Sequence, residues 1–215
     1  MNLCKPGIAA ALLTVPFIAG CSNQGKIDPT GGITAVRTAC PRVGVPAGTG
    51  DITLFDPANS RLASDIDVTA TITNVRANCT DATSDVVSAI SFDIFARRAE
   101  AGPARDVTLP YFVTVVQGGT SVTAKRVARV TVHFDQGQLR ARTSAQGTAI
   151  VNRAAATLPQ DIRDRITQKR KAGDMSAAVD PLSIPEVRDA VRSATFEALV
   201  GFQLTEDQLK YNLTR

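Results

Sequence analysis

Hydrophobic and polar residues alternate along much of the chain between residues 35 and 152. Every second residue is apolar over residues 66 to 72, 90 to 96 and 130 to 134, and most of the residues between them are polar. This period of two predicts strands with one buried and one solvated face. Turn residues such as Gly102-Pro103 and Gly118-Gly119 separate the strands. The spacing predicts an antiparallel β-sandwich of the immunoglobulin or fibronectin type, and the lack of tryptophan argues only against the true immunoglobulin subfamily.

The pattern changes near residue 155. Ile162 and Ile166 lie four residues apart in a charged stretch, residues 159 to 172, that ends before Gly173, which predicts a helix. Ser183 and Glu186 have the spacing of a capping box and predict the start of a second short helix. Alternation returns over residues 196 to 204, and a helical turn is predicted over residues 205 to 211. We therefore expect a helical insertion, residues 155 to 194, before the last strand of the sandwich.

The first 20 residues have the pattern of an export signal. Lys5 precedes an apolar run, residues 8 to 19, that is too short to span a bilayer as a stable helix. The segment Ile18-Ala19-Gly20-Cys21 resembles the lipobox of bacterial lipoproteins, and this resemblance implies cleavage after Gly20 and lipidation of Cys21. An ordinary signal peptide with an unmodified Cys21 is the alternative. Ser22 follows in place of the aspartate that retains lipoproteins in the inner membrane, which favours the periplasmic face of the outer membrane.

Composition adds limits to this picture. The 215 residues are 44% hydrophobic, which is ordinary for a globular protein. We expect a flexible tether over residues 21 to 34 and one domain over residues 35 to 211. The formal charge is +4, and loss of the first 20 residues, which contain one basic residue, leaves 23 basic and 20 acidic residues, or +3. The densest basic block, residues 169 to 171, lies at a predicted helix end, where cations complement the helix dipole, so no nucleic-acid partner is expected.

The cysteine count predicts a disulfide. Of the four cysteines, Cys4 is lost with the signal and Cys21 carries the lipid, which leaves Cys40 and Cys79 in an oxidising compartment. A bridge between them is expected, and two buried free thiols are the alternative. The sequence has one histidine and no Cys-x-x-Cys pair, so a metal site is not expected.

Several segments carry a family resemblance. They are residues 39 to 43 (ACPRV), 72 to 76 (ITNVR), 110 to 113 (PYFV) and 199 to 205 (LVGFQLT). With the lipobox, these segments resemble a family of uncharacterised lipoproteins from alphaproteobacteria. The resemblance extends over most of the chain after residue 20, and it implies neither a catalytic residue nor a ligand.

Catalytic constellations have weak support in the sequence. His133 lies on the solvated face of a predicted strand and has no Gly-x-Ser-x-Gly nucleophile elbow to accompany it. The carboxylate pairs Asp65/Asp67 and Glu206/Asp207 lie at the starts of a strand and of a helix, where structural roles explain them. We therefore expect no catalytic residue, no cofactor and no enzymatic activity.

Two features suggest an interaction surface. Tyr111 and Phe112 are adjacent on a strand, so one ring should face outward when the other faces the core. Ile162 and Ile166 need an apolar cover, either the sandwich or a partner protein. The favoured hypothesis is a non-catalytic binding or assembly module, held at the membrane by its lipid and contacting other envelope proteins. A carrier of a small lipid or peptidoglycan fragment is the alternative, and a hydrolase is less favoured.

Overall fold

A computed structural model gives the fold over residues 26–27, 33–34, 38–168, 173 and 179–214. The chain divides into two units, residues 1 to 37 and residues 38 to 215. The first unit contains the antiparallel pair β1 (Lys26–Ile27) and β2 (Ile33–Thr34). The export signal, Cys21 and most of the expected tether lie outside the described residues. Within the described part of the chain, no helix is long and apolar enough to cross a membrane.

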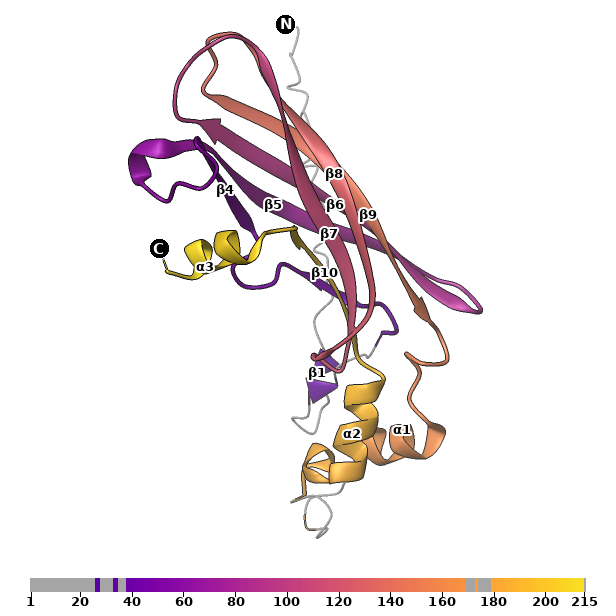
Figure 1. Cartoon of the computed structure of the whole chain (residues 1–215). Helices are drawn as coiled ribbons and strands as arrows, with labels where there is room; N and C mark the ends of the chain where they lie inside the picture. Colours follow the sequence, from indigo (N-terminus) through magenta and orange to yellow (C-terminus); the bar gives the residue numbers. More distant parts are fainter. Residues whose placement is uncertain (1–25, 28–32, 35–37, 169–172, 174–178, 215) are drawn as a thin grey trace, which may run out of the picture. The chain divides into compact units, whose positions relative to one another are not determined.

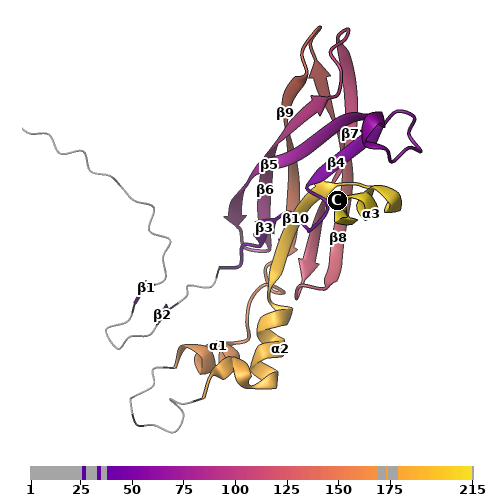
Figure 2. The ribbon, with the colours of Figure 1, turned by 90° about the vertical axis from the view of Figure 1, so that its left-hand side faces the viewer.

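The second unit is a sandwich of two four-stranded sheets (Figures 1 and 2). One sheet has the order β3-β10-β7-β8, and the other has the order β4-β5-β6-β9. All neighbouring strands are antiparallel except β3 and β10. The predicted β-sandwich is therefore confirmed. The strands are β3 (Arg42–Gly44), β4 (Asp51–Phe55), β5 (Ile66–Asp81), β6 (Asp85–Arg98), β7 (Arg105–Gln117), β8 (Ser121–Phe134), β9 (Arg140–Asn152) and β10 (Phe196–Phe202).

The core follows from the alternation in the sequence. On β6, Ile90, Phe92, Ile94 and Ala96 are buried, while Ser91, Phe95 and Arg97 on the opposite face are exposed. The last strand, β10, buries Phe196, Ala198, Val200 and Phe202, which confirms that it completes the sandwich. The hairpin between β7 and β8 turns at Gly118 and Gly119, whose φ angles of 63° and 77° suit glycine.

A buried arginine ties the loops together at one end of the sandwich. Arg98 is 2% exposed and has no acidic partner among the described residues. Its guanidinium donates to the backbone carbonyls of Gly102, Pro103, Asp135 and Gln138. These four acceptors satisfy the buried charge, so Arg98 has a structural role.

The helical insertion contains α1 (Gln160–Thr167), a 3-10 turn (Pro181–Ser183) and α2 (Pro185–Ser193). Ile162 packs in a small cluster of its own with Leu158, Val187 and Ala194, and Ile166 lies at the edge of that cluster. We expected the sandwich or a partner protein to cover Ile162. This expectation is wrong, because α2 covers Ile162. Both views place α1 and α2 near the β7–β8 turn, where Arg192 donates to the carbonyl of Gly118 (Figures 1 and 2).

The predicted capping box at Ser183 is wrong. Pro185 is the first residue of α2, and Ile184 precedes it without a side-chain cap. Ser183 instead belongs to the 3-10 turn, where Asp180 accepts from the backbone N–H of Leu182. Proline favours the first helical position, and with Pro185 there the N-cap residue is Ile184, whose side chain has no acceptor for the N–H groups of the first turn.

The last described element is α3 (Glu206–Thr214), which ends three residues beyond the predicted turn. Thr205 and Gln208 form a reciprocal capping box at its start. Asn212 donates to the carbonyls of Gly48 and Asp51, and the Tyr211 ring meets Phe55 edge-on at 5.2 Å. These contacts hold α3 beside β4, which is the edge strand of its sheet. A short 3-10 turn (Ala63–Asp65) precedes β5.

Candidate functional site

The residues predicted as functional are distributed over separate parts of the fold. Cys40 and Cys79 form a disulfide with their Cα atoms 6.1 Å apart, which confirms the predicted bridge. Tyr111 belongs to the core cluster and Phe112 lies outside it. They are 7% and 8% exposed, so neither ring is available to a partner and the interaction surface expected at these two residues is wrong. Tyr111 donates from its hydroxyl to the Gln146 carbonyl at 2.7 Å, and the Lys125 ammonium covers the ring of Phe112 at 4.8 Å.

A different aromatic residue, Phe95, is exposed on the outer side of the other sheet. Its side chain is 47% exposed, and the Arg142 guanidinium lies 5.0 Å from its ring centre. The strand register gives its neighbours, because β6 lies between β5 and β9. Phe95 is opposite Thr71 on one side and Arg142 on the other, and the next row contains Thr69, Arg97 and Arg140.

We define the arginine face as the outer surface of β5, β6 and β9 around Phe95. It also contains a row with Thr73, Asp93 and Ser144 and a row with Arg76, Ser91 and Gln146. Among the residues of this face, only Arg142 forms an ion pair, with Asp93 at 2.7 Å. Cross-strand neighbours lie about 5 Å apart, so the cations gather within one continuous surface. The four arginines are Arg76, Arg97, Arg140 and Arg142.

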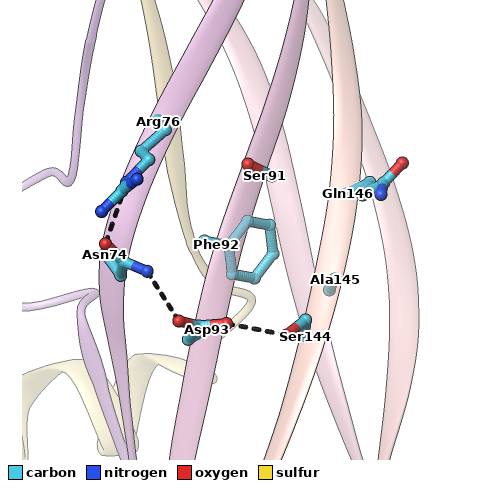
Figure 3. A pocket seen from close by; sticks show the side chains of 8 residues that line it. All are labelled: Asn74, Arg76, Ser91, Phe92, Asp93, Ser144, Ala145 and Gln146. Atoms are coloured by element: carbon cyan, nitrogen blue, oxygen red, sulfur yellow. Dashed lines mark hydrogen bonds between the residues drawn. The ribbon is translucent and has the colours of Figure 1, made fainter.

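A polar cavity of about 300 Å³ lies at one end of the arginine face (Figure 3). Asp93 lies at the edge of this cavity and accepts hydrogen bonds from Ser144 at 2.7 Å, from Asn74 at 2.8 Å and from Arg142 at 2.7 Å. The donors Ser144 and Asn74, followed by Arg142, lower the pKa of the Asp93 carboxyl from 3.8 to about 2. Asp93 is therefore an ionised acceptor whose oxygens already have donors, and it is a poor general base at neutral pH.

The position of Asn74 depends on a bulge in β5. The pairing with β6 shifts between Thr73 and Arg76, and Asn74 adopts a φ of 54°. Asparagine tolerates this left-handed conformation better than most residues, and a bulge re-aims the side chain beside it. Asn74 thereby reaches Asp93 with its amide nitrogen and accepts from Arg76 with its amide oxygen at 3.0 Å (Figure 3).

A second hollow of about 380 Å³ lies at the other end of the face, with Phe95, Arg97 and Arg140 in its lining. A third hollow of about 530 Å³ lies among loops at the end of the sandwich. Two of the four acids that line that third hollow have internal partners, since Asp65 accepts from Ser60 and Ser64 and Asp67 pairs with Arg105. The arginine face therefore offers more unpaired charge than the loop hollow.

His133, Glu206 and Asp207 form ion pairs on the surface of the protein. His133 is exposed on β8 between Asp106 at 2.6 Å and Asp135 at 3.4 Å, and the hydrogen bond to Asp106 raises the pKa of its imidazole. Glu206 pairs with Lys210 within α3, and Asp207 lies 3.5 Å from Arg61. Within the described ranges, no group of three His, Cys, Asp or Glu residues could hold a metal ion.

Sequence alternation indicated that Phe95, Arg97 and Asp93 share a solvated face, but it gave no means of placing Arg140 and Arg142 beside them. Strands β6 and β9 are neighbours in the sheet, although β7 and β8 lie between them along the chain and belong to the other sheet. This pairing brings the residues of the site together. Comparison of the chain with protein-family models, with curated proteins and with solved structures found no match.

Proposed function

We propose that this protein is a lipid-anchored, non-catalytic binding module at the periplasmic face of the outer membrane, and that it contacts an envelope partner protein through the arginine face. The observation that supports this role most strongly is the exposed Phe95, surrounded by arginines of which Arg76, Arg97 and Arg140 lack an ion-pair partner among the described residues. The lipobox supports the anchor, and the solvated sheet supports a contact through a surface.

The chemistry of the arginine face fits a protein partner with acidic side chains. A guanidinium binds a carboxylate through two parallel hydrogen bonds, and arginine and aromatic residues are enriched among those that dominate protein interfaces. Phe95 supplies an apolar centre, and Arg97 and Arg140 supply charge one row away. The hydrogen bond to Asp93 and the contact with the Phe95 ring hold the Arg142 side chain in place, which reduces the conformational entropy lost on binding.

The carrier alternative requires an apolar cavity between the two sheets. That interior is filled by large side chains, with Phe92, Phe134 and Phe202 each at most 2% exposed. The three hollows described above open on the outer face or among loops and are lined mostly by outward or loop residues, and no observation in the interior favours a carried ligand over a packed core.

Position-specific crosslinking in intact cells tests the proposed surface. A photoreactive amino acid at Phe95 should capture a discrete envelope protein, whereas the same amino acid at Thr148 should not. Thr148 is the matched control because it is exposed on β9, on the same outer side of the sheet and beyond Gln146. Equal capture at both positions, or capture at neither, would contradict the proposed surface.

The anchor is tested separately with Cys21→Ala. Metabolic labelling with a fatty-acid analogue should mark the parent protein and leave the variant unlabelled, and the variant should lose its membrane association. Equal labelling of both proteins would show that Cys21 does not carry the lipid. This result would leave the proposed binding surface untested, because that surface lies within residues 38 to 215 and Cys21 precedes them.

A further inference from the structure

Strand β8 is exposed on both sides over most of its length. Every residue from 121 to 129 is exposed, including Val122 at 62% and Val127 at 57%, and burial begins only toward Val132 and Phe134. β8 is also the outermost strand of its sheet and pairs only with β7. Half of its main-chain donors and acceptors therefore face an open edge, which is a template for pairing with another strand.

Contacts on its paired side hold the open strand in place. The turn before it is fixed by Arg192, which donates to the Gly118 carbonyl and to the Thr120 hydroxyl. Thr114 donates to the Ala124 carbonyl, and Lys125 covers the Phe112 ring. A fixed strand loses little conformational entropy when a further strand pairs with it.

The exposed part of β8 is basic. Lys125, Arg126 and Arg129 lie within residues 121 to 129, a stretch without an acidic residue, and none of the three forms an ion pair with a described residue. Cations on an edge strand discourage pairing with a second copy, because antiparallel pairing of β8 with itself brings these like charges together. The same cations favour a strand of opposite charge.

We propose that β8 accepts an extended acidic segment of a partner protein as an added antiparallel strand. Lys125, Val127 and Arg129 share one side of β8, and Arg126 lies on the other side. The added strand therefore carries acidic residues opposite Lys125, Arg126 and Arg129 and an apolar residue opposite Val127. This site lies on the sheet that does not contain the arginine face, so it stands independently of the proposed function.

The probe is a synthetic ten-residue peptide with glutamates opposite Lys125, Arg126 and Arg129 and valine opposite Val127, and its control is a peptide of the same composition in scrambled order. Binding to the full-length protein is followed by fluorescence anisotropy. The designed peptide should bind at least about tenfold more tightly than the scrambled one, and the double variant Lys125→Glu/Arg129→Glu should lose this preference. Arg163→Glu, an exposed charge reversal on α1, is the matched control and should bind like the parent.

Amide hydrogen exchange gives the second readout. Strand addition protects the amides of residues 121 to 129 that face the open edge, whereas simple charge attraction does not. Bound peptide without this protection would overturn the proposal. Loss of binding in Arg97→Glu/Arg140→Glu with retention in the β8 variant would overturn it too, because the peptide would then bind the arginine face. A photoreactive amino acid at Val127 gives a further test. Capture of only a second copy of the chain, or of only lipid, would overturn the proposal and indicate self-association or membrane contact.

Discussion

The two sides of strand β6 have different physical roles. One side places Ile90, Phe92 and Ile94 in the interior, each at most 2% exposed. The other side places Ser91, Phe95 and Arg97 in solvent and Asp93 in a hydrogen-bond network. Both sides come from one stretch of sequence with a period of two, so a substitution at one residue and a substitution at its neighbour reach different environments.

Stability and recognition can be separated by position in this sheet. Burial of a large apolar side chain stabilises a fold by about 1.5 to 3 kcal/mol, while an exposed residue contributes little to folding. The inner side therefore supports the fold, and the outer side is free to bind.

The largest effect is expected from matched truncations on β6. Phe92→Ala removes a buried ring that meets Tyr111 edge-on at 5.2 Å, and it should lower the free energy of unfolding by about 3 to 5 kcal/mol. Phe95→Ala removes an exposed ring and should change it by about 0.5 kcal/mol or less. Chemical denaturation of both variants measures the difference. Similar losses would show that the two sides of β6 are not separate in energy.

The disulfide provides a second way to weaken the inner side. Cys40 and Cys79 are 39 residues apart, both pack against the core, and their bridge constrains the unfolded chain. The variant Cys40→Ala/Cys79→Ala should lose about 4 kcal/mol in the chain-entropy model. Thermal unfolding with and without reductant measures this loss. The unfolding temperature of the parent should fall under reduction, and that of the variant should not change. A parent that is unaffected by complete reduction would contradict this role.

The apolar cluster of the helical insertion is separate from the main core, and we expect the two to unfold independently. Ile162→Ala should lower the stability of the α1–α2 cluster by about 2 to 4 kcal/mol and leave the sandwich folded, because Ile162 contacts the helical cluster and not the main core. Amide exchange should become faster in α1 and α2 and stay unchanged in β6. Faster exchange throughout β6 would show that the two clusters unfold together.

The smallest effect concerns pH on the outer side. The hydrogen bonds to Asp93 lower its pKa to about 2, so they stabilise the fold above the ordinary carboxyl value of 3.8. This stabilisation is lost as the pH falls toward 2, since the protonated carboxyl gains less from its donors. Asp93→Asn should therefore be less stable than the parent at pH 6, and the difference should shrink toward pH 2. Melting curves across this range give the comparison, and a difference independent of pH would contradict the assignment.

Local patterns in the sequence predicted the faces of the strands and missed their neighbours. The alternation around Phe92 and around Val200 predicted the correct buried sides, because the period of a strand is a local property. The place of Arg142 beside Phe95 depends on the pairing of β6 with β9, which is not local. The burial of Arg98 was missed for the same reason, since its four carbonyl partners come from two separate loops.

Capping signals show how competing local rules limit prediction. Ser183 and Glu186 have the spacing of a capping box, but Pro185 starts α2 and the serine belongs to the preceding turn. Thr205 and Gln208 have the same spacing and do form the box. The difference is the proline, which favours the first helical position and so makes Ile184, which has no side-chain acceptor, the N-cap residue in place of Ser183.

The central claim is that Arg97 and Arg140 of the arginine face bind a partner and contribute little to the stability of the fold. The most direct measurement compares the double variant Arg97→Glu/Arg140→Glu with its parent in the Phe95 crosslinking experiment, together with the unfolding temperature of each purified protein. The account predicts loss of the captured partner with an unfolding temperature that stays within a few degrees of the parent. A variant that still captures the partner as well as the parent, or one that loses it only because it unfolds, would contradict the claim.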